Sequence, residues 1–264
     1  MASSGERGVV TAVPLTSQNG SAPDTTAVSS APPLSLHNVE VGYGRIKVLF
    51  GVDVRLEHGA VMALLGPNGA GKSTTLGVMS GLLRPWSGCR HVAGNHVNEA
   101  SASELARLGV RHVREGRSIF PNLSVADNLR VAAAGGATLA RVEEVAYELF
   151  PVLGLRRRQL AGTLSGGEQQ MLSLARGLGP DPAVLLIDEL SMGLAPIVVA
   201  ELYEAVSAVA ALGVAVLVVE QFVTIAMKYA RDVIVMNHGR IAFRGPSTSA
   251  HDAIHRAYLG TTSQ

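Results

Sequence analysis

The amino-acid sequence predicts an α/β fold in which strands alternate with helices around a phosphate-binding loop. Residues 66–74 have the Gly-x-x-x-x-Gly-Lys-Ser spacing of such a loop. The loop follows the apolar run 60–65, which has the length of a strand, and it precedes apolar residues at helical spacing that end at Leu83. Residues 184–187 and 214–219 are continuous apolar runs, as expected for strands that a parallel sheet buries on both faces.

The predicted loop has the residue types that binding of a nucleoside triphosphate requires. Its glycines let the backbone fold back, so that successive N–H groups point at an anion. Lys72 adds a positive charge for the β- and γ-phosphates, and the Ser73 hydroxyl can ligate the accompanying Mg²⁺. The positive dipole end of the helix that follows also faces the phosphates. The residues assigned to the triphosphate are Gly66, Pro67, Asn68, Gly69, Ala70, Gly71, Lys72, Ser73 and Thr74.

Composition excludes several other functions. A formal net charge of +1 gives no basis for nucleic-acid binding, which needs a clustered basic face. The single cysteine, Cys89, excludes an internal disulfide framework and suits a reducing cytosol. No apolar run has the length that spans a bilayer, so a role at a membrane is expected only through a partner.

The chain begins with a segment that is unlike the rest. Residues 1–33 are rich in Ser, Thr, Ala, Gly and Pro, and they are predicted to be a disordered tail. Strand patterns start at Leu34, and the domain is expected to extend to residue 260. Tyr43, which lies between two glycines, is either an ordinary core ring or a stacking platform for a base. The flanking glycines favour an exposed loop and therefore stacking.

Residues 101–180 are mainly helical in pattern and are predicted to form an inserted helical subdomain. Ser101 with Glu104, and Ser124 with Asp127, have the spacing of capping boxes that open helices. A longer helix is expected over 139–153.

Residues 164–170, Leu-Ser-Gly-Gly-Glu-Gln-Gln, open a further helix and form a second potential anion site. One nucleotide cannot readily occupy two sites on one chain when each is the start of a separate helix. Two chains that face each other could share it.

Two carboxylates, Asp188 and Glu189, follow the apolar run 184–187, at the carboxyl end of a strand where α/β sheets place ligands. Unpaired buried carboxylates are costly, so a cation is expected nearby, and Mg²⁺ on the triphosphate would serve Asp188. Glu189 is then free to orient or deprotonate an attacking water. The loop that follows is predicted to end where Pro196 starts a helix.

With these motifs in order, the chain resembles an ATP-binding subunit of an ABC transporter over residues 34–260. Within that family it is most similar to the ATPases of branched-chain amino acid importers. The stretches that carry the likeness are Glu-Gly-Arg-Ser-Ile-Phe-Pro at 115–121, Leu-Ser-Gly-Gly-Glu-Gln-Gln-Met-Leu at 164–172, Gly-Leu-Ala-Pro at 193–196 and Val-Glu-Gln at 219–221. The fold implied is a P-loop NTPase core with an antiparallel β subdomain and an inserted helical subdomain.

The resemblance also implies roles for individual residues. Tyr43 would stack on adenine, residues 66–74 would hold the phosphates of ATP, and Glu189 would be the general base. Ser165, Gly166 and Gly167 would bind the ATP held by an opposing subunit. Glu115 stands where most ABC ATPases have a glutamine that touches Mg²⁺ and the attacking water, and Gln221 stands at the usual switch-histidine position. The Mg²⁺ ligands would be Ser73, Asp188 and Glu115, and the catalytic residues Glu189, Lys72, Gln221 and Glu115.

The partners implied are a second ATPase subunit, either a related chain or a second copy, and transmembrane permease subunits. The expected location is the cytoplasmic face of the cell membrane. The function implied is ATP hydrolysis that energises import of branched-chain or other amino acids. The alternative is a soluble ABC-type ATPase with a regulatory role and no transporter, but long coiled-coil heptads or a second cassette would mark such a protein, and neither is present.

Overall fold

The computed structural model describes the chain except for residues 1–30, 115, 117, 135–136 and 260–264. The predicted disordered tail over 1–33 therefore lies, as far as residue 30, outside the described residues. From Ala31 onward the described chain forms one compact unit.

An antiparallel sheet of four strands comes first in the chain, in the order β2-β1-β4-β5. Its strands are β1 (Leu34–Tyr43), β2 (Ile46–Arg55), β4 (Ser87–Val92) and β5 (Asn95–His96). Tyr43 and Ile46 are register partners, so β1 and β2 form a hairpin with a two-residue turn. Gly44 lies in that turn with a φ of 60°, a conformation that glycine adopts without steric cost.

The second sheet has six strands in the order β10-β9-β3-β8-β7-β6. They are β3 (Val61–Leu65), β6 (Val110–Val113), β7 (Val184–Asp188), β8 (Ala215–Val219), β9 (Asp232–Asn237) and β10 (Arg240–Pro246). β10 pairs antiparallel with β9, whereas the other neighbours in this sheet are parallel. β3 and β7 therefore end at the same edge of the sheet, where the phosphate loop and the acidic pair lie together.

The alternation of side chains along each strand divides the core between the two faces of this sheet. On β7, Leu185 and Ile187 pack with α3–α7, while Val184 and Leu186 pack with α1 and the antiparallel sheet. A third cluster joins β3 and β9 to α8 and α9. Both faces are covered, which explains why these strands are continuous apolar runs.

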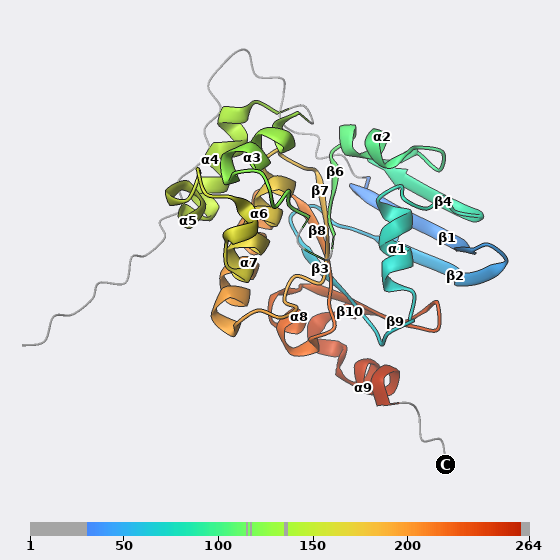
Figure 1. Cartoon of the computed structure of the whole chain (residues 1–264). Helices are drawn as coiled ribbons and strands as arrows, with labels where there is room; N and C mark the ends of the chain where they lie inside the picture. The colour runs from blue at the N-terminus through green and yellow to red at the C-terminus, as the bar shows by residue number, and fades with distance from the viewer. Residues whose placement is uncertain (1–30, 115, 117, 135–136, 260–264) are drawn as a thin grey trace, which may run out of the picture. The chain divides into compact units, whose positions relative to one another are not determined.

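The helices form the layers on either side of the six-stranded sheet (Figure 1). Their bounds are α1 (Lys72–Met79), α2 (Ala102–Arg107), α3 (Val125–Ala133), α4 (Leu139–Leu149), α5 (Pro151–Leu155), α6 (Gly166–Leu178), α7 (Pro196–Ala211), α8 (Val223–Tyr229) and α9 (His251–Leu259). Ser101 caps α2 in a complete capping box, as predicted. Ser124 caps α3, but the predicted box is incomplete there, because the Asp127 carboxylate accepts from the Ser124 hydroxyl and not from its N–H. Pro196 is the first residue of α7. The helix expected over 139–153 is interrupted at Phe150, because Pro151 has no N–H to continue the hydrogen bonding of α4.

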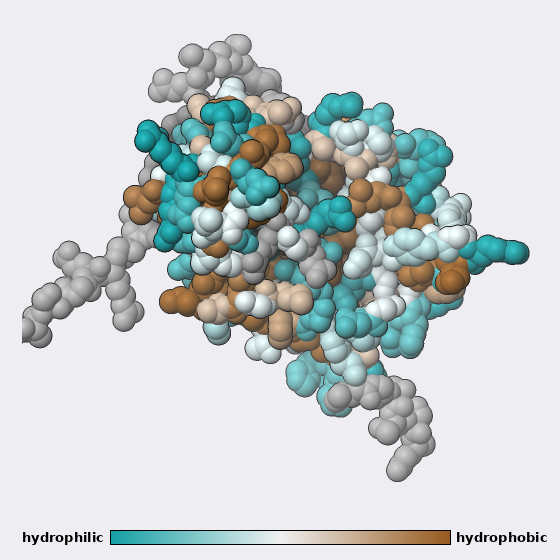
Figure 2. Space-filling model, in the orientation of Figure 1, coloured by the Kyte–Doolittle hydropathy of each residue, from teal (hydrophilic) through white to brown (hydrophobic). Residues whose placement is uncertain are grey.

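The range 101–180 contains elements of two kinds. α3, α4, α5 and α6 pack against one another, whereas β6 belongs to the six-stranded sheet and α2 contributes Leu105 to the core beside α1. On the face drawn in Figure 2, hydrophobic residues occur in small groups among hydrophilic ones. Within the part of the chain that the structure describes, no helix combines the length and the apolar character needed to cross a membrane.

Candidate nucleotide site

The predicted phosphate loop connects β3 to the first residue of α1, as the sequence indicates. Gly66, at the start of the loop, has a φ of 153°, and a Cβ there would lie 2.4 Å from the carbonyl oxygen of Met236 on β9. Gly71 precedes α1 with a φ of 105°. A side chain at Gly66 would collide with the backbone of the neighbouring strand, so the loop can lie this close to the sheet only with glycine at that position.

Lys72 is folded back over the loop. Its Nζ donates hydrogen bonds to the carbonyl oxygens of Gly66, at 2.7 Å, and Pro67, at 3.1 Å. Burial lowers the pKa of Lys72, and the negative charges of Glu189 and Asp188 act in the opposite direction. The lysine and the two carboxylates therefore lie within electrostatic reach of one another, which places the charges predicted for phosphate and metal at one site.

The acidic pair is positioned by the strand beside it. Asp188 is the last residue of β7, opposite Val219 in the register, and the N–H of Glu189 donates to the carbonyl oxygen of Val219 at 3.0 Å. Glu189 has a φ of 51°, in the left-handed region that few residues other than glycine adopt. The Nε2 of Gln221, which follows β8, donates to Glu189 Oε1 at 2.5 Å. Glu189 and Gln221, which are 32 residues apart, are thus brought into direct contact.

Tyr43 stands at the end of β1 with 54% of its surface exposed, so it is not an ordinary core ring. Its hydroxyl lies 3.4 Å from the Oγ1 of Thr74, the last residue of the predicted loop segment. The ring is therefore beside the phosphate loop and open to a ligand. Its stacking on adenine stays a prediction.

A cleft of about 550 Å³ opens beside the phosphate loop. Of the residues assigned to the triphosphate, Gly69 lines it, together with Lys47, Phe50 and Arg240 from β2 and β10. Lys47 Nζ and the Arg240 guanidinium lie over the Phe50 ring, 5.3 and 5.2 Å from its centroid. The cleft is large enough for a small-molecule ligand, although Lys47 forms an ion pair with Glu40 that offsets part of the positive charge of this cleft.

The second predicted anion site lies on the other face of the sheet. Ser165 caps α6: its Oγ accepts from the N–H of Glu168 at 3.3 Å, and its own N–H donates to Glu168 Oε2 at 2.9 Å. α6 packs in the hydrophobic cluster on one face of the six-stranded sheet, and α1 packs in the cluster on the other face. Ser165 is exposed, and Gly166 and Gly167 are partly exposed. The N-terminus of α6 is therefore accessible to a partner.

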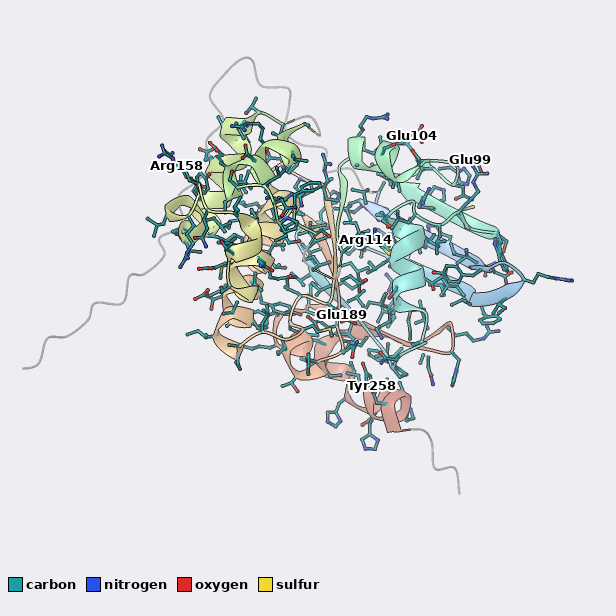
Figure 3. All side chains as sticks on the ribbon, viewed as in Figure 1. Glu99, Glu104, Arg114, Arg158, Glu189 and Tyr258 are labelled. Atoms are coloured by element: carbon teal, nitrogen blue, oxygen red, sulfur yellow. The ribbon has the colours of Figure 1, made fainter. Side chains whose placement is uncertain are left out.

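Two contacts of the site have no local sequence signal. Tyr258 of α9 accepts a hydrogen bond from the N–H of Gly66 at 3.0 Å, across 192 residues. Glu220 is buried beside Gln221 and accepts a hydrogen bond from the N–H of Ser191, 29 residues away in the chain. Glu189 and Tyr258 lie toward the same edge of the sheet in Figure 3, whereas Arg158 lies at the far end of the helical layer. Glu115 and Arg117 fall outside the described residues.

Three features together define an ATP-binding cassette. They are a phosphate loop after a central parallel strand, a helical layer that contains a second glycine-rich helix start, and an antiparallel sheet over α1. The family model described as "ABC transporter" matches residues 49–191. The high-affinity branched-chain amino acid transport ATP-binding protein BraG of Pseudomonas aeruginosa is 38% identical over 86% of this chain and 99% of its own. The probable branched-chain amino acid transport ATP-binding protein LivF of Archaeoglobus fulgidus is 30% identical over 84% of this chain and 96% of its own. The chain belongs to the ABC transporter family, and it is an ATPase of that family.

Solved structures confirm the predicted fold. The ATP-binding subunit of an ABC transporter superposes with a TM-score of 0.74 at 25% identity, covering 88% of this chain and 95% of its own. An ABC-transporter cassette in its ADP conformation has a TM-score of 0.78 at 24% identity, covering 88% of this chain and all of its own (100%). The P-loop NTPase core with an antiparallel and a helical part is therefore established for this chain.

Proposed function

We propose that this chain binds and hydrolyses ATP to energise an importer of branched-chain or other amino acids. The observation that carries the proposal is the contact of Glu189 with Gln221 within electrostatic reach of Lys72, at the edge where the phosphate loop lies. The likeness to BraG, over nearly the whole of that protein, supports the transport role and the amino-acid class. A soluble ATPase with a regulatory role is not favoured, because the relatives that cover most of this chain are transport proteins.

Each proposed catalytic side chain has a separate task. Lys72 supplies positive charge to the β- and γ-phosphates. Glu189 accepts the proton of the attacking water, and Gln221 orients the Glu189 carboxylate through the hydrogen bond at 2.5 Å. Little covalent chemistry is required of the protein, because phosphoryl transfer depends mainly on positioning and charge stabilisation.

The residues at the loop fit a magnesium ion that is bound together with the nucleotide. Ser73 is exposed at the start of α1 and Asp188 ends β7, and both provide the oxygen ligands that Mg²⁺ prefers. Among the described residues, no group of three or more His, Cys, Asp or Glu side chains could hold a metal without further ligands. Phosphate oxygens would complete the site, and the ion would neutralise charge on the phosphates. Glu115 remains the third proposed ligand.

The second subunit is proposed to complete each ATP site with its own Ser165, Gly166 and Gly167. Since α1 and α6 pack on opposite faces of the sheet, the exposed start of α6 suits a nucleotide held by another chain. Met192, Ile197 and Phe222 lie close in sequence to Glu189 and Gln221, and each is more than half exposed (58%, 72% and 56%). These apolar side chains offer a surface for that subunit, which is either a related chain or a second copy.

Ser165→Glu tests the shared site. We expect ATP binding to the monomer to stay within about twofold, and hydrolysis to fall at least about a hundredfold, because a carboxylate would repel the γ-phosphate of the opposing subunit. Calorimetric ATP binding to dilute protein and phosphate release at high protein concentration measure the two effects. Ser101→Glu is the matched control, since Ser101 also caps a helix through a complete capping box. Equal loss of ATP binding in the monomer would place Ser165 in the site of its own chain.

The permease is proposed to dock beside Phe120, at the cytoplasmic face of the membrane. The ring of Phe120 is 45% exposed and lies against the guanidinium of Arg176 of α6, 4.8 Å from the ring centroid. Asn128 of α3 fixes the backbone, accepting from Phe120 N–H at 2.8 Å and donating to its carbonyl oxygen at 2.9 Å. The backbone is held while the ring is presented, and Arg114 adds an exposed charge nearby in the chain.

Phe120→Ala tests the docking site and the transport function together. We expect capture of the permease subunits from membranes to weaken about tenfold, as for loss of an aromatic anchor, with ATP affinity of the isolated chain unchanged. Pull-down from membranes and ATP-driven uptake of labelled leucine into vesicles are the measurements. Leu108→Ala is the control, because Leu108 is a similarly exposed apolar residue (51%) at the end of α2. If the wild-type chain captures no membrane subunit, the regulatory alternative replaces the importer.

A further inference from the structure

Glu220 is a carboxylate buried at the end of β8, with 1% of its surface exposed. Its Oε1 accepts hydrogen bonds from the N–H of Ser191 at 3.0 Å and from the hydroxyl of Tyr203 at 3.1 Å. Its Oε2 accepts from the hydroxyl of Ser191 at 2.8 Å. Ser191 and Tyr203 are themselves buried, and in all three hydrogen bonds the Glu220 carboxylate is the acceptor. This arrangement suits an ionised carboxylate, which accepts and does not donate.

The network encloses the backbone of Glu189. The N–H of Glu189 donates a hydrogen bond to the carbonyl oxygen of Val219. After Glu189 in the chain, Ser191 donates hydrogen bonds from both its N–H and its hydroxyl to Glu220, the residue that follows β8. Glu189 has a φ of 51°, and a residue other than glycine keeps this conformation only where its surroundings impose it. The end of β8 therefore holds the turn that carries Glu189.

Tyr203 ties the same carboxylate to α7. It is buried, and its ring stacks on Tyr229 of α8 with 4.8 Å between centroids. The pKa of Glu220 is raised above its ordinary value, because the effect of burial exceeds that of the hydrogen bonds from Ser191 and Tyr203, which lower it. A buried carboxylate adds little to stability compared with a well-packed apolar residue, so stability alone does not account for a glutamate here.

We propose that Glu220 is a positioning residue for ATP hydrolysis. It holds Ser191, and through Ser191 it keeps the backbone of Glu189 in the left-handed conformation that directs the Glu189 carboxylate to Gln221. The inference rests on the proposed role of Glu189 as general base. Glu220 itself does not touch the nucleotide in this scheme.

Glu220→Ala and Glu220→Gln in the full-length chain test the inference by steady-state ATP hydrolysis. We expect kcat to fall about tenfold to a hundredfold in Glu220→Ala and about tenfold in Glu220→Gln, with KM for ATP within about twofold of wild type. Tyr203→Phe keeps both Ser191 bonds and should lower kcat by no more than about threefold. A residue with a purely structural role would lower the amount of folded enzyme, and not kcat per folded molecule.

A double-mutant cycle with Glu189→Gln separates positioning from other roles. If Glu220 acts through Glu189, adding Glu220→Ala to Glu189→Gln lowers kcat by less than about twofold further. Independent, multiplying losses would overturn the proposal. Wild-type kcat in Glu220→Ala, together with an inactive Glu189→Gln, would also overturn it and leave the general base intact. Wild-type turnover in Glu189→Gln would instead refute the proposed function of that residue. Should Glu220→Ala not fold, Glu220→Gln and Tyr203→Phe retain the shape of the buried side chains and decide the question.

Discussion

Glu189→Gln is expected to reduce ATP hydrolysis by about a hundredfold or more while ATP binding is retained, because an amide cannot accept the proton of the attacking water. The substitution preserves the shape of the side chain, and the amide oxygen can still accept the hydrogen bond that Gln221 donates to Oε1. The loss should therefore report proton transfer and not a rearranged loop. Phosphate release and equilibrium ATP binding on the same protein sample measure the two quantities.

The control for this variant is Glu204→Gln, which makes the same chemical change on the exposed face of α7. Its turnover and melting temperature should equal those of the wild type. Hydrolysis by Glu189→Gln at the wild-type rate would show that another group activates the water. The hydrogen bond between Gln221 and Glu189 would then have a structural role and no catalytic one.

Lys72→Ala is expected to weaken ATP binding by about a hundredfold or more, since hydrogen bonds from a charged group to the phosphates are lost. A second effect acts in the same direction. Lys72 Nζ bridges the carbonyl oxygens of Gly66 and Pro67, so the variant also loses a brace within the loop. With Lys72 absent, the charges of Asp188 and Glu189 lose the lysine that offsets them and repel the nucleotide more strongly.

Binding of a fluorescent ATP analogue, with a thermal melt of the same sample, measures the effect of Lys72→Ala. Lys228→Ala is the control, because Lys228 is an exposed lysine on α8 that lies over the ring of Tyr229. Nucleotide affinity and a melting temperature that both equal those of the wild type would contradict the proposed roles of Lys72 in binding phosphate and in bracing the loop. A lower melting temperature with normal affinity would assign the lysine to bracing the loop alone.

Short stretches of the sequence predict much of the architecture. The phosphate loop is recognised because a strand, three glycines and a lysine must occur in one order for backbone N–H groups to surround an anion. The starts of α2 and α3 are recognised because a serine followed three positions later by an acidic residue is typical of a helix start, where the serine oxygen accepts a hydrogen bond from the N–H of that residue. These features depend on neighbours along the chain, so local spacing is sufficient to predict them.

The details of the site depend on residues that the fold brings together over long distances. Only the packing of β9 beside β3 places the carbonyl oxygen of Met236 against Gly66. Only the position of α9 brings Tyr258 to the N–H of Gly66. Periodicity shows that a strand is buried, but it does not show which strand lies next to it.

The acidic pair illustrates where sequence information ends. The carboxylates that follow the apolar run 184–187 predict from the sequence alone that Asp188 and Glu189 are site residues, because a buried strand that ends in charge needs a ligand or a partner. The pairing of β7 with β8 then decided the rest: it set Val219, Glu220 and Gln221 against this turn. The chemical groups of the site were thus determined by sequence, and their contacts by tertiary structure, since hydrogen bonds form between atoms that are close in space whatever their separation in the chain.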